Sequence, residues 1–310
     1  MSKDSISKEF IERWESFYGK ERANIIVTNL RKLDPRIIFP NSLKIDLSTL
    51  KNQLEDKNFK FTYIKEFNGL IVEDEPFSIV STPEYLGGLF SIQALTSIFP
   101  PKILKPSQDS VILDMTASPG IKTCLLAQEM KNQGLIIAIE KSKSRLSALK
   151  ANIARMGISN TIMLNFDATN LYKLNIQVDH VLLDAPCSGT GLKMSKNKRL
   201  EPKTLNDIFR HAKQQETLLE IAWKLLKPRG TLIYSTCSLE PEEGEKQILD
   251  FLLNHEHEAT LLPLSITSGI SGEDTKWDNS VHPQLKETRR ILPKIGFDGF
   301  FIALLQKRLH

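Results

Sequence analysis

Residues 111–140 read VILDMTASPGIKTCLLAQEMKNQGLIIAIE, in which apolar runs alternate with a helical pattern. An apolar run, VILDM, leads through a turn of small residues into the helical pattern GIKTCLLAQEMKNQG, and a second apolar run, LIIAIE, follows. Strands that are apolar throughout are buried on both faces, and a helix between two of them is typical of a parallel sheet. The stretch therefore predicts a strand–helix–strand unit.

The same alternation continues towards the C-terminus. Further strands are expected at TIMLNFD (161–167), VDHVLLD (178–184), GTLIYST (230–236) and GFFIALLQ (299–306). Helices are expected over 142–157, near 213–227 and near 241–254. The pattern predicts an α/β fold in which helices cover both faces of a mostly parallel sheet, and such sheets bind ligands beyond the carboxyl ends of their strands.

The residues before this region have a different pattern. Over 8–33, four aromatic residues at helical spacing (Phe10, Trp14, Phe17, Tyr18) predict an amphipathic helix that ends before Asp34-Pro35. A helix over 48–59 and short strands at 59–64 and 69–74 predict a small α/β unit. We therefore expect residues 1–75 to form a small region of their own and residues 76–310 to form the main domain.

Composition excludes several classes of protein. The 310 residues are 25% charged and 41% hydrophobic, as in ordinary globular domains, and the net charge of +4 only weakly favours an anionic partner. Three cysteines without a CxxC pair argue against a disulfide framework and against a structural zinc site, and the six histidines show no metal or triad arrangement. MSKDSISKEF lacks a signal-peptide core, and no apolar run approaches membrane-spanning length. We expect a cytoplasmic monomer without metal or membrane.

Polar residues at the ends of the first three strands of the sheet predict a cofactor site. The turn from Thr116 to Lys122 opens a helix whose free amides can meet a polar ligand. Glu140 and Asp167 end the next two strands, placed to bind a ribose and an adenine amine. Each acid alone also fits a helix cap. Because GxGxxG is absent, the set favours S-adenosylmethionine over NAD.

Two cysteines follow the next two strands. Cys187 lies in Asp184-Ala-Pro-Cys and Cys237 in Tyr-Ser-Thr-Cys-Ser, whereas Cys124 lies on a helix face that we expect to be buried. Two thiols and an acid beside a methyl donor suit methylation at C5 of a pyrimidine. A thiolate that adds to C6 turns the weakly nucleophilic C5 into an enamine carbon.

The segments around Cys187 and Cys237 are similar to those of a known protein family. The segments DAPCSGTG (184–191) and IYSTCSLEPEEGE (233–245) resemble the Sun-domain (Nol/Nop/Sun) RNA cytosine-C5 methyltransferases, most closely their compact archaeal tRNA-modifying members. The likeness extends from ERWESFYG near the N-terminus to DGFFIA near the C-terminus. It implies a Rossmann-like class I methyltransferase fold with a seven-stranded sheet, S-adenosylmethionine as donor, RNA (tRNA favoured) as substrate, and an RNA-engaging region over residues 1–75.

The resemblance also implies roles by position. Cys237 is the expected nucleophile, Cys187 assists release of the methylated RNA, Asp184 contacts the flipped cytosine, and Lys122 lies near this acid. The expected donor-binding residues are Thr116, Ala117, Ser118, Pro119, Gly120, Ile121, Lys122, Glu140, Arg145, Asp167 and Asp184. The sequence departs from the family at Ile121, where a glycine is usual, and in PKIGFDGFF (293–301), which lacks the usual histidine.

A run of basic residues directly follows the segment DAPCSGTG (184–191) and predicts contacts with RNA phosphates. Such contacts fix the position of the RNA on the protein but do not recognise its sequence. The expected RNA-binding residues are Lys193, Lys196, Lys198 and Arg199, with Arg289 and Arg290 as a second patch. Four alternatives stay open: rRNA as substrate, an RNA-binding assembly factor with weak turnover, a methyltransferase of exocyclic amines, and a thiol redox enzyme. The last two account poorly for the cysteines, since amine chemistry needs no Cys237 and redox motifs space their thiols closely.

Overall fold

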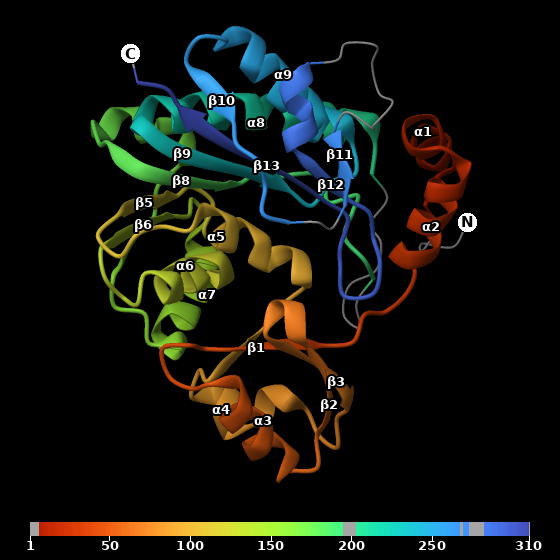
Figure 1. Cartoon of the computed structure of the whole chain (residues 1–310), viewed down its shortest axis with the longest axis vertical. Helices are drawn as coiled ribbons and strands as arrows, with labels where there is room; N and C mark the ends of the chain where they lie inside the picture. Colours follow the sequence, from red (N-terminus) through yellow and green to blue (C-terminus); the bar gives the residue numbers. More distant parts are fainter. Residues whose placement is uncertain (1–5, 195–202, 267–268, 273–281, 310) are drawn as a thin grey trace. The chain divides into compact units, whose positions relative to one another are not determined.

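A computed structural model describes residues 6–194, 203–266, 269–272 and 282–309 (Figure 1). The chain forms two compact units. The first unit comprises residues 1–34 and 169–310, and the second comprises residues 35–168. Each contains its own strands and helices.

Two of the three parallel strands of the second unit come from the opening stretch, and the third follows it in the sequence. Strands β5 (Val111–Asp114), β6 (Leu135–Ile139) and β7 (Thr161–Leu164) pair in parallel in this order, with α6 (Ile121–Glu129) and α7 (Lys143–Met156) between them in sequence. Asp114 lies opposite Ala138, and Ile139 lies opposite Leu164, so the three strands end at one edge. The predicted strand–helix–strand units are confirmed.

A small antiparallel sheet completes the second unit. Its strands, in the order β2-β3-β1-β4, are Lys60–Ile64, Gly69–Asp74, Ile37–Pro40 and Phe90–Ile92. The helices of this region are α3 (Leu47–Glu55), α4 (Pro83–Leu86) and α5 (Phe99–Leu104). The sequence predicted β2, β3 and α3 but not β1 and β4, because strands of four and three residues are too short to show a period.

Close backbone packing joins this sheet to α7. The buried amide of Asn41 donates to the carbonyls of Gly88 and Met156, at 2.9 and 2.8 Å. Gly88 has φ +68°, and a Cβ there would lie 1.9 Å from the carbonyl oxygen of Arg155. Only glycine allows this approach.

The first unit has a mixed sheet in the order β11-β12-β13-β9-β8, with β10 paired to β13. Strand β8 (Val178–Asp184) is parallel to β9 (Leu226–Thr236), and β13 is antiparallel to β9. Helix α8 packs against β8 and β9 (Figure 1). The remaining elements are β10 (Ala259–Leu261), β11 (Ile270–Ser271), β12 (Arg289–Ile291), β13 (Phe300–Lys307), α8 (Leu205–Leu225) and α9 (Glu245–Asn254). The sequence predicted β5–β9 and β13 as strands but did not predict the short strands β10, β11 and β12, so the described residues contain more strands than the seven that the resemblance implies.

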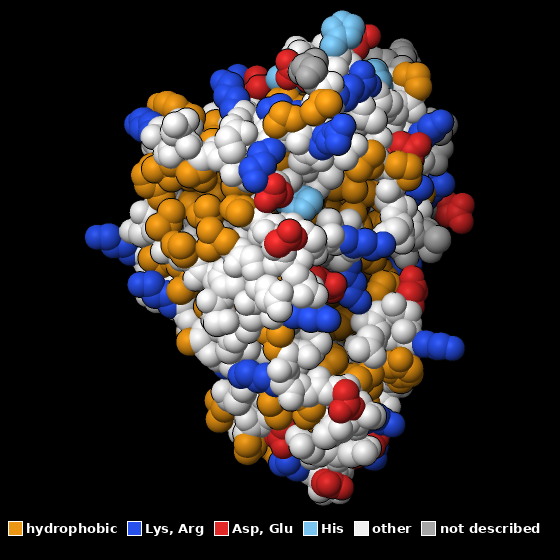
Figure 2. Space-filling model, turned by 60° about the vertical axis from the view of Figure 1, so that its left-hand side comes forward, with side chains coloured by type: hydrophobic (Ala, Val, Ile, Leu, Met, Phe, Trp, Pro, Cys, Tyr) orange, Lys and Arg blue, Asp and Glu red, His pale blue; other side chains and the backbone are white. Residues whose placement is uncertain are grey.

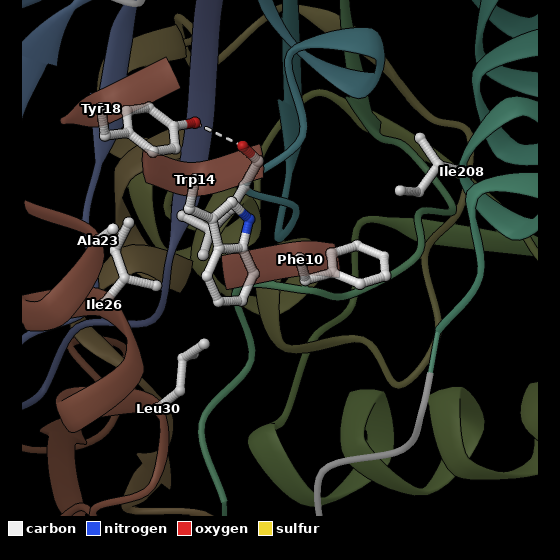
Figure 3. Close-up of a cluster of buried hydrophobic side chains, with 8 residues drawn as sticks. Phe10, Trp14, Tyr18, Ala23, Ile26, Leu30 and Ile208 are labelled. Carbon is white, nitrogen blue, oxygen red and sulfur yellow. Dashed lines mark hydrogen bonds between the residues drawn. The ribbon is translucent and has the colours of Figure 1, made fainter. Parts of the chain in front are cut away.

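The N-terminal segment forms two helices, not the one that was predicted over 8–33. Helix α1 (Lys8–Tyr18) and helix α2 (Lys20–Leu30) meet at Gly19, whose φ of 81° and ψ of 157° interrupt helical geometry. In Figure 3 side chains of both helices converge, and the Tyr18 hydroxyl donates to the carbonyl of Leu239. The cluster of buried side chains comprises Phe10, Trp14, Tyr18, Ala23, Ile26, Leu30, Ile208 and Leu239.

The hairpin of α1 and α2 therefore packs within the first unit. These units are groups of residues in close contact, and the functional division at residue 75 stays a prediction.

Within the described part of the chain, every helix is too short or too polar to cross a lipid bilayer.

We expect Trp14→Ala to lower the free energy of unfolding by about 3–5 kcal/mol, as for other buried aromatic residues. Its side chain is 2% exposed, and its indole Nε1 donates to the buried carboxylate of Glu240 at 2.9 Å. Ile25→Ala, at a side chain of α2 that is 44% exposed, should cost about 0.5 kcal/mol. Chemical unfolding followed by circular dichroism measures both, and equal losses would contradict the packing of α1.

Candidate active site

Two neighbouring parallel strands bring three of the predicted catalytic residues together, whereas the fourth, Lys122, lies on α6 of the second unit. Asp184, the last residue of β8, lies opposite Ser235 of β9. The Ser235 hydroxyl donates to Asp184 Oδ1 at 2.7 Å, and the Ala185 amide donates to the Ser235 carbonyl at 2.8 Å. Because the strands end in register, the segments that follow them leave the sheet side by side.

These segments place two sulfur atoms in contact. Cys187 Sγ lies 3.0 Å from Cys237 Sγ, and both thiols are free and half-buried. The hydrogen bond to Cys237 raises the pKa of Cys187 well above its usual value, and burial and the charges of Glu243 and Asp184 act in the same direction. Cys187 therefore keeps its proton, and its S–H can donate a hydrogen bond to the sulfur of Cys237.

Backbone contacts fix the Cys237 segment. The amide of Gly191 donates to the Cys237 carbonyl at 3.0 Å, and the amide of Gly299 donates to the Gly191 carbonyl at 2.7 Å. The Leu239 amide donates to the Thr190 hydroxyl at 2.9 Å. A Cβ at Gly191 would lie 2.4 Å from the carbonyl oxygen of Gly299, so no side chain fits between these two backbones.

In the second unit, the turn between β5 and α6 is attached to α7. The Ser118 hydroxyl donates to the Arg145 carbonyl, and Arg145 returns a guanidinium hydrogen bond to the Ser118 carbonyl, both at 2.9 Å. Asn152 donates to the Pro119 carbonyl at 2.9 Å. Ile121 begins α6 and is partly exposed, so its side chain is not part of the core. The turn keeps its shape through polar contacts with α7.

The acids at the end of the same sheet lie where the sequence predicts. Glu140 follows β6, is 4% exposed, accepts from the Ser142 amide at 2.7 Å and faces Arg145 Nε at 3.5 Å. Asp167 follows β7 and is partly exposed. Asp114, the last residue of β5, accepts from the Thr123 hydroxyl at 2.7 Å. This edge offers buried acceptors beside a helix N-terminus.

The third cysteine belongs to the core. Cys124 is 1% exposed on α6, as expected, and burial raises its pKa to about 12. A thiol with this pKa stays protonated and unreactive at neutral pH.

Two of the predicted RNA contacts need correction. Lys193 is 8% exposed, and its ammonium group pairs with Asp34 and donates to the Lys294 carbonyl at 3.1 Å. Arg290 is fully buried and pairs with Glu245. Neither side chain faces solvent, because each compensates a carboxylate within the protein.

The other predicted RNA contacts stay predictions. Lys196, Lys198 and Arg199 lie outside the described residues. Arg289 is half-buried, and its guanidinium donates to the carbonyls of Lys286 and Thr288. On the face shown in Figure 2, the described lysine and arginine side chains are dispersed among other residue types.

Sequence reasoning gave no role to the acids that follow Cys237. In SLEPEEGE the carboxylates of Glu240, Glu243 and Glu245 are all fully buried. Their position directly after the cysteine motif was the only signal, because a run of acids is ordinarily read as a solvated surface.

Comparison with known proteins assigns the chain to a family. The family model described as "16S rRNA methyltransferase RsmB/F" matches residues 101–306, which include both thiols and the turn before α6. The chain belongs to the RsmB/F family. The class I methyltransferase fold expected from the resemblance is therefore confirmed.

Two RsmB/F relatives differ in length. A "tRNA (cytosine(49)-C(5))-methyltransferase" of Pyrococcus abyssi is 32% identical over 97% of this chain and 96% of its own length. The human "28S rRNA (cytosine(4447)-C(5))-methyltransferase" is 36% identical over 88% of this chain but only 34% of its own length. Across four eukaryotic relatives named as rRNA methyltransferases, the matched part is 31–46% of their length.

Solved structures agree with this assignment. A methyltransferase homolog from Pyrococcus horikoshii superposes with a TM-score of 0.86 at 36% identity, covering 98% of this chain and 96% of its own. NSun6 from the same organism, solved with SFG, gives a TM-score of 0.87 at 27% identity over 99% and 100% of the two chains.

We expect Cys187 to react slowly with iodoacetamide at pH 8, because the raised pKa leaves little thiolate. Cys237→Ala removes the largest cause of that shift, so the pKa of Cys187 should fall and its alkylation should accelerate. Well below the pKa, each unit of decrease raises the thiolate fraction about tenfold. Peptide mapping by mass spectrometry measures the rates, with buried Cys124 as the unreactive internal control. An unchanged rate at Cys187 would exclude the thiol–thiol hydrogen bond as the cause.

Proposed function

We propose that this RsmB/F protein is an S-adenosylmethionine-dependent RNA cytosine-C5 methyltransferase. The observation that carries the proposal is the pair of thiols, 3.0 Å apart at the ends of adjacent parallel strands with Asp184 beside them. Its relatives named as cytosine-C5 methyltransferases support the same chemistry. A redox role fits less well, because neither cysteine has redox-motif spacing.

The second unit offers a site that fits the donor. The turn Thr116–Lys122 presents the N-terminal amides of α6, and Glu140 supplies a buried carboxylate that can accept from ribose hydroxyls. Arg145 holds the turn, and Asp167 follows the next strand. S-adenosylmethionine would supply a methyl group carried on a sulfonium ion.

In the first unit, Cys237 is the proposed nucleophile. Once a base has taken the thiol proton, the sulfur electron pair forms a bond to C6 of cytosine, and the C5–C6 π electrons shift so that C5 becomes nucleophilic. C5 would then take the methyl group from the donor, and the electrons of the broken sulfur–methyl bond would stay on the donor sulfur, which becomes a neutral thioether. Loss of the C5 proton to a base restores the double bond, and the C6–S bond breaks with its electrons returning to sulfur. Asp184 contacts the N3 edge of the base and stabilises the adduct.

Cys187 is the proposed release residue. Its raised pKa keeps the S–H intact, and the 3.0 Å separation lets this S–H donate to the sulfur of Cys237. A hydrogen bond to sulfur stabilises the thiolate as it leaves C6, so Cys187 lowers the barrier to elimination.

We further propose tRNA as the substrate and residues 1–75 as part of its binding region, in a cytoplasmic monomer. The Pyrococcus abyssi relative that matches over 96% of its own length is named a tRNA methyltransferase, which favours tRNA over rRNA. The relatives named for rRNA are much longer than the segment they share with this chain.

We expect the protein to transfer labelled methyl groups from S-adenosylmethionine to bulk tRNA, with 5-methylcytidine found after digestion. Bulk rRNA is the parallel substrate and should accept less label. Folded protein that labels neither RNA would exclude the proposed activity and favour an assembly factor, and preferential labelling of rRNA would overturn only the choice of substrate.

The two thiols should give different mutant phenotypes. Cys237→Ala should lower transfer by more than about 10³-fold without trapping RNA, because no C6 bond can form. Cys187→Ala should accumulate a covalent protein–RNA adduct, visible as a shifted band on a denaturing gel, because release is slowed. Cys124→Ala is the matched control and should do neither. An adduct with Cys237→Ala would reverse the two roles.

A further inference from the structure

A buried carboxylate connects the segments that carry the two thiols. Glu243 is fully buried and follows Cys237 by six positions, in the turn before α9. Ser188 directly follows Cys187, and Ser238 directly follows Cys237. Both serine hydroxyls donate to Oε2 of Glu243, the one from Ser238 at 2.5 Å. One carboxylate oxygen is therefore shared by the two cysteine segments.

The second oxygen of the same carboxylate adds further contacts. Oε1 accepts from the backbone amide of Ser188 at 2.8 Å and from the side-chain amide of Gln215 at 3.0 Å. Gln215, fully buried on α8, also donates to the carbonyl of Pro186 at 2.9 Å, one residue before Cys187. Four donors thus fill the acceptor capacity of Glu243, as a buried carboxylate requires.

The backbone of Glu243 is attached to the strand that carries the nucleophile. Its carbonyl accepts from the Tyr234 hydroxyl at 2.9 Å and from the Thr236 hydroxyl at 3.2 Å, both on β9. The carboxylate is thus fixed relative to the end of β9. Its hydrogen bonds with Ser188 therefore hold the Cys187 segment next to Cys237.

We propose that Glu243 is a positioning residue for the reaction, holding the Cys187 and Cys237 segments so that their sulfurs stay in contact. The catalytic role of Glu243 rests on the proposed function. The hydrogen bonds of its carboxylate are observed in the first unit whatever the function. Glu243 acts through Ser188 and Ser238 and needs no contact with RNA or donor.

A neighbouring glutamate offers a matched control. Glu240 is equally buried, but its carboxylate accepts from Trp14 Nε1 at 2.9 Å and pairs with Arg13 at 3.1 Å, both on α1. A Glu→Gln substitution at either position removes a buried charge at nearly constant volume. Only the change at position 243 alters contacts with the serines beside the thiols.

The first experiment measures thiol contact without RNA or donor. Diamide oxidises two adjacent thiols to a disulfide. The rate at which the Cys187–Cys237 disulfide forms, measured by non-reducing peptide mapping, depends on the fraction of time that the two sulfurs are in contact. We expect Glu243→Gln to slow this rate about tenfold or more, because misplacement of about 1 Å has effects of that size. Glu240→Gln should stay within about twofold of wild type. Folded Glu243→Gln protein that cross-links at the wild-type rate would overturn the inference.

A milder variant covers the case in which Glu243→Gln does not fold. Ser188→Ala removes one hydroxyl donor and keeps its amide contact, so the cross-linking rate should fall about threefold. An unchanged rate would also overturn the inference.

The second experiment measures catalysis. Glu243→Gln should lower kcat about 10- to 100-fold and leave KM for tRNA and for the donor within about twofold, since Glu243 is fully buried and its side chain is not available to either ligand. A rise in KM with unchanged kcat would contradict a positioning role. If wild-type protein cross-links as expected but methylates no RNA, the proposed function fails and the geometric inference stands. If wild type methylates RNA and Glu243→Gln matches it, the inference fails and the function stands.

Discussion

A buried carboxylate must find hydrogen-bond donors, and this requirement organises the first unit around the end of β9. Three glutamates within six residues are fully buried, and each is compensated by a different part of the chain. Glu240 accepts a hydrogen bond from Trp14 and pairs with Arg13, both on α1. Glu243 accepts hydrogen bonds from the serines beside the thiols. Glu245 pairs with Arg290 of β12. Segments far apart in sequence are thereby fixed around the segment that begins at Cys237.

The reactivity of the thiol pair follows from this arrangement together with the register of two strands. Parallel pairing places Asp184 opposite Ser235, so the acid and both cysteine segments leave the sheet at one edge. The hydrogen bond to Cys237, burial and nearby negative charge together raise the pKa of Cys187 and keep its proton in place. A thiol that keeps its proton suits the proposed role of Cys187 as the release residue.

The part of the site that could be predicted from the sequence is the part that local patterns encode. Asp184 ends one apolar strand and Glu140 directly follows another, and the end of a parallel strand is a defined place in space. The charged residues were harder to interpret. Lys193 and Arg290 looked like surface cations but are buried partners of Asp34 and Glu245, and a pairing across 159 or 45 residues leaves no local pattern.

Taken alone, the sequence determined the alternation of strands and helices, the family, and the positions of the two cysteines at strand ends, because periodicity and short motifs are properties of neighbouring residues. Only the tertiary structure decided that the sulfurs touch, that α1 and α2 are separate helices packed on Leu239, and that Glu243 joins Ser188 to Ser238. These depend on side chains that meet through the packing of distant segments, where burial forces each polar group to find its partner.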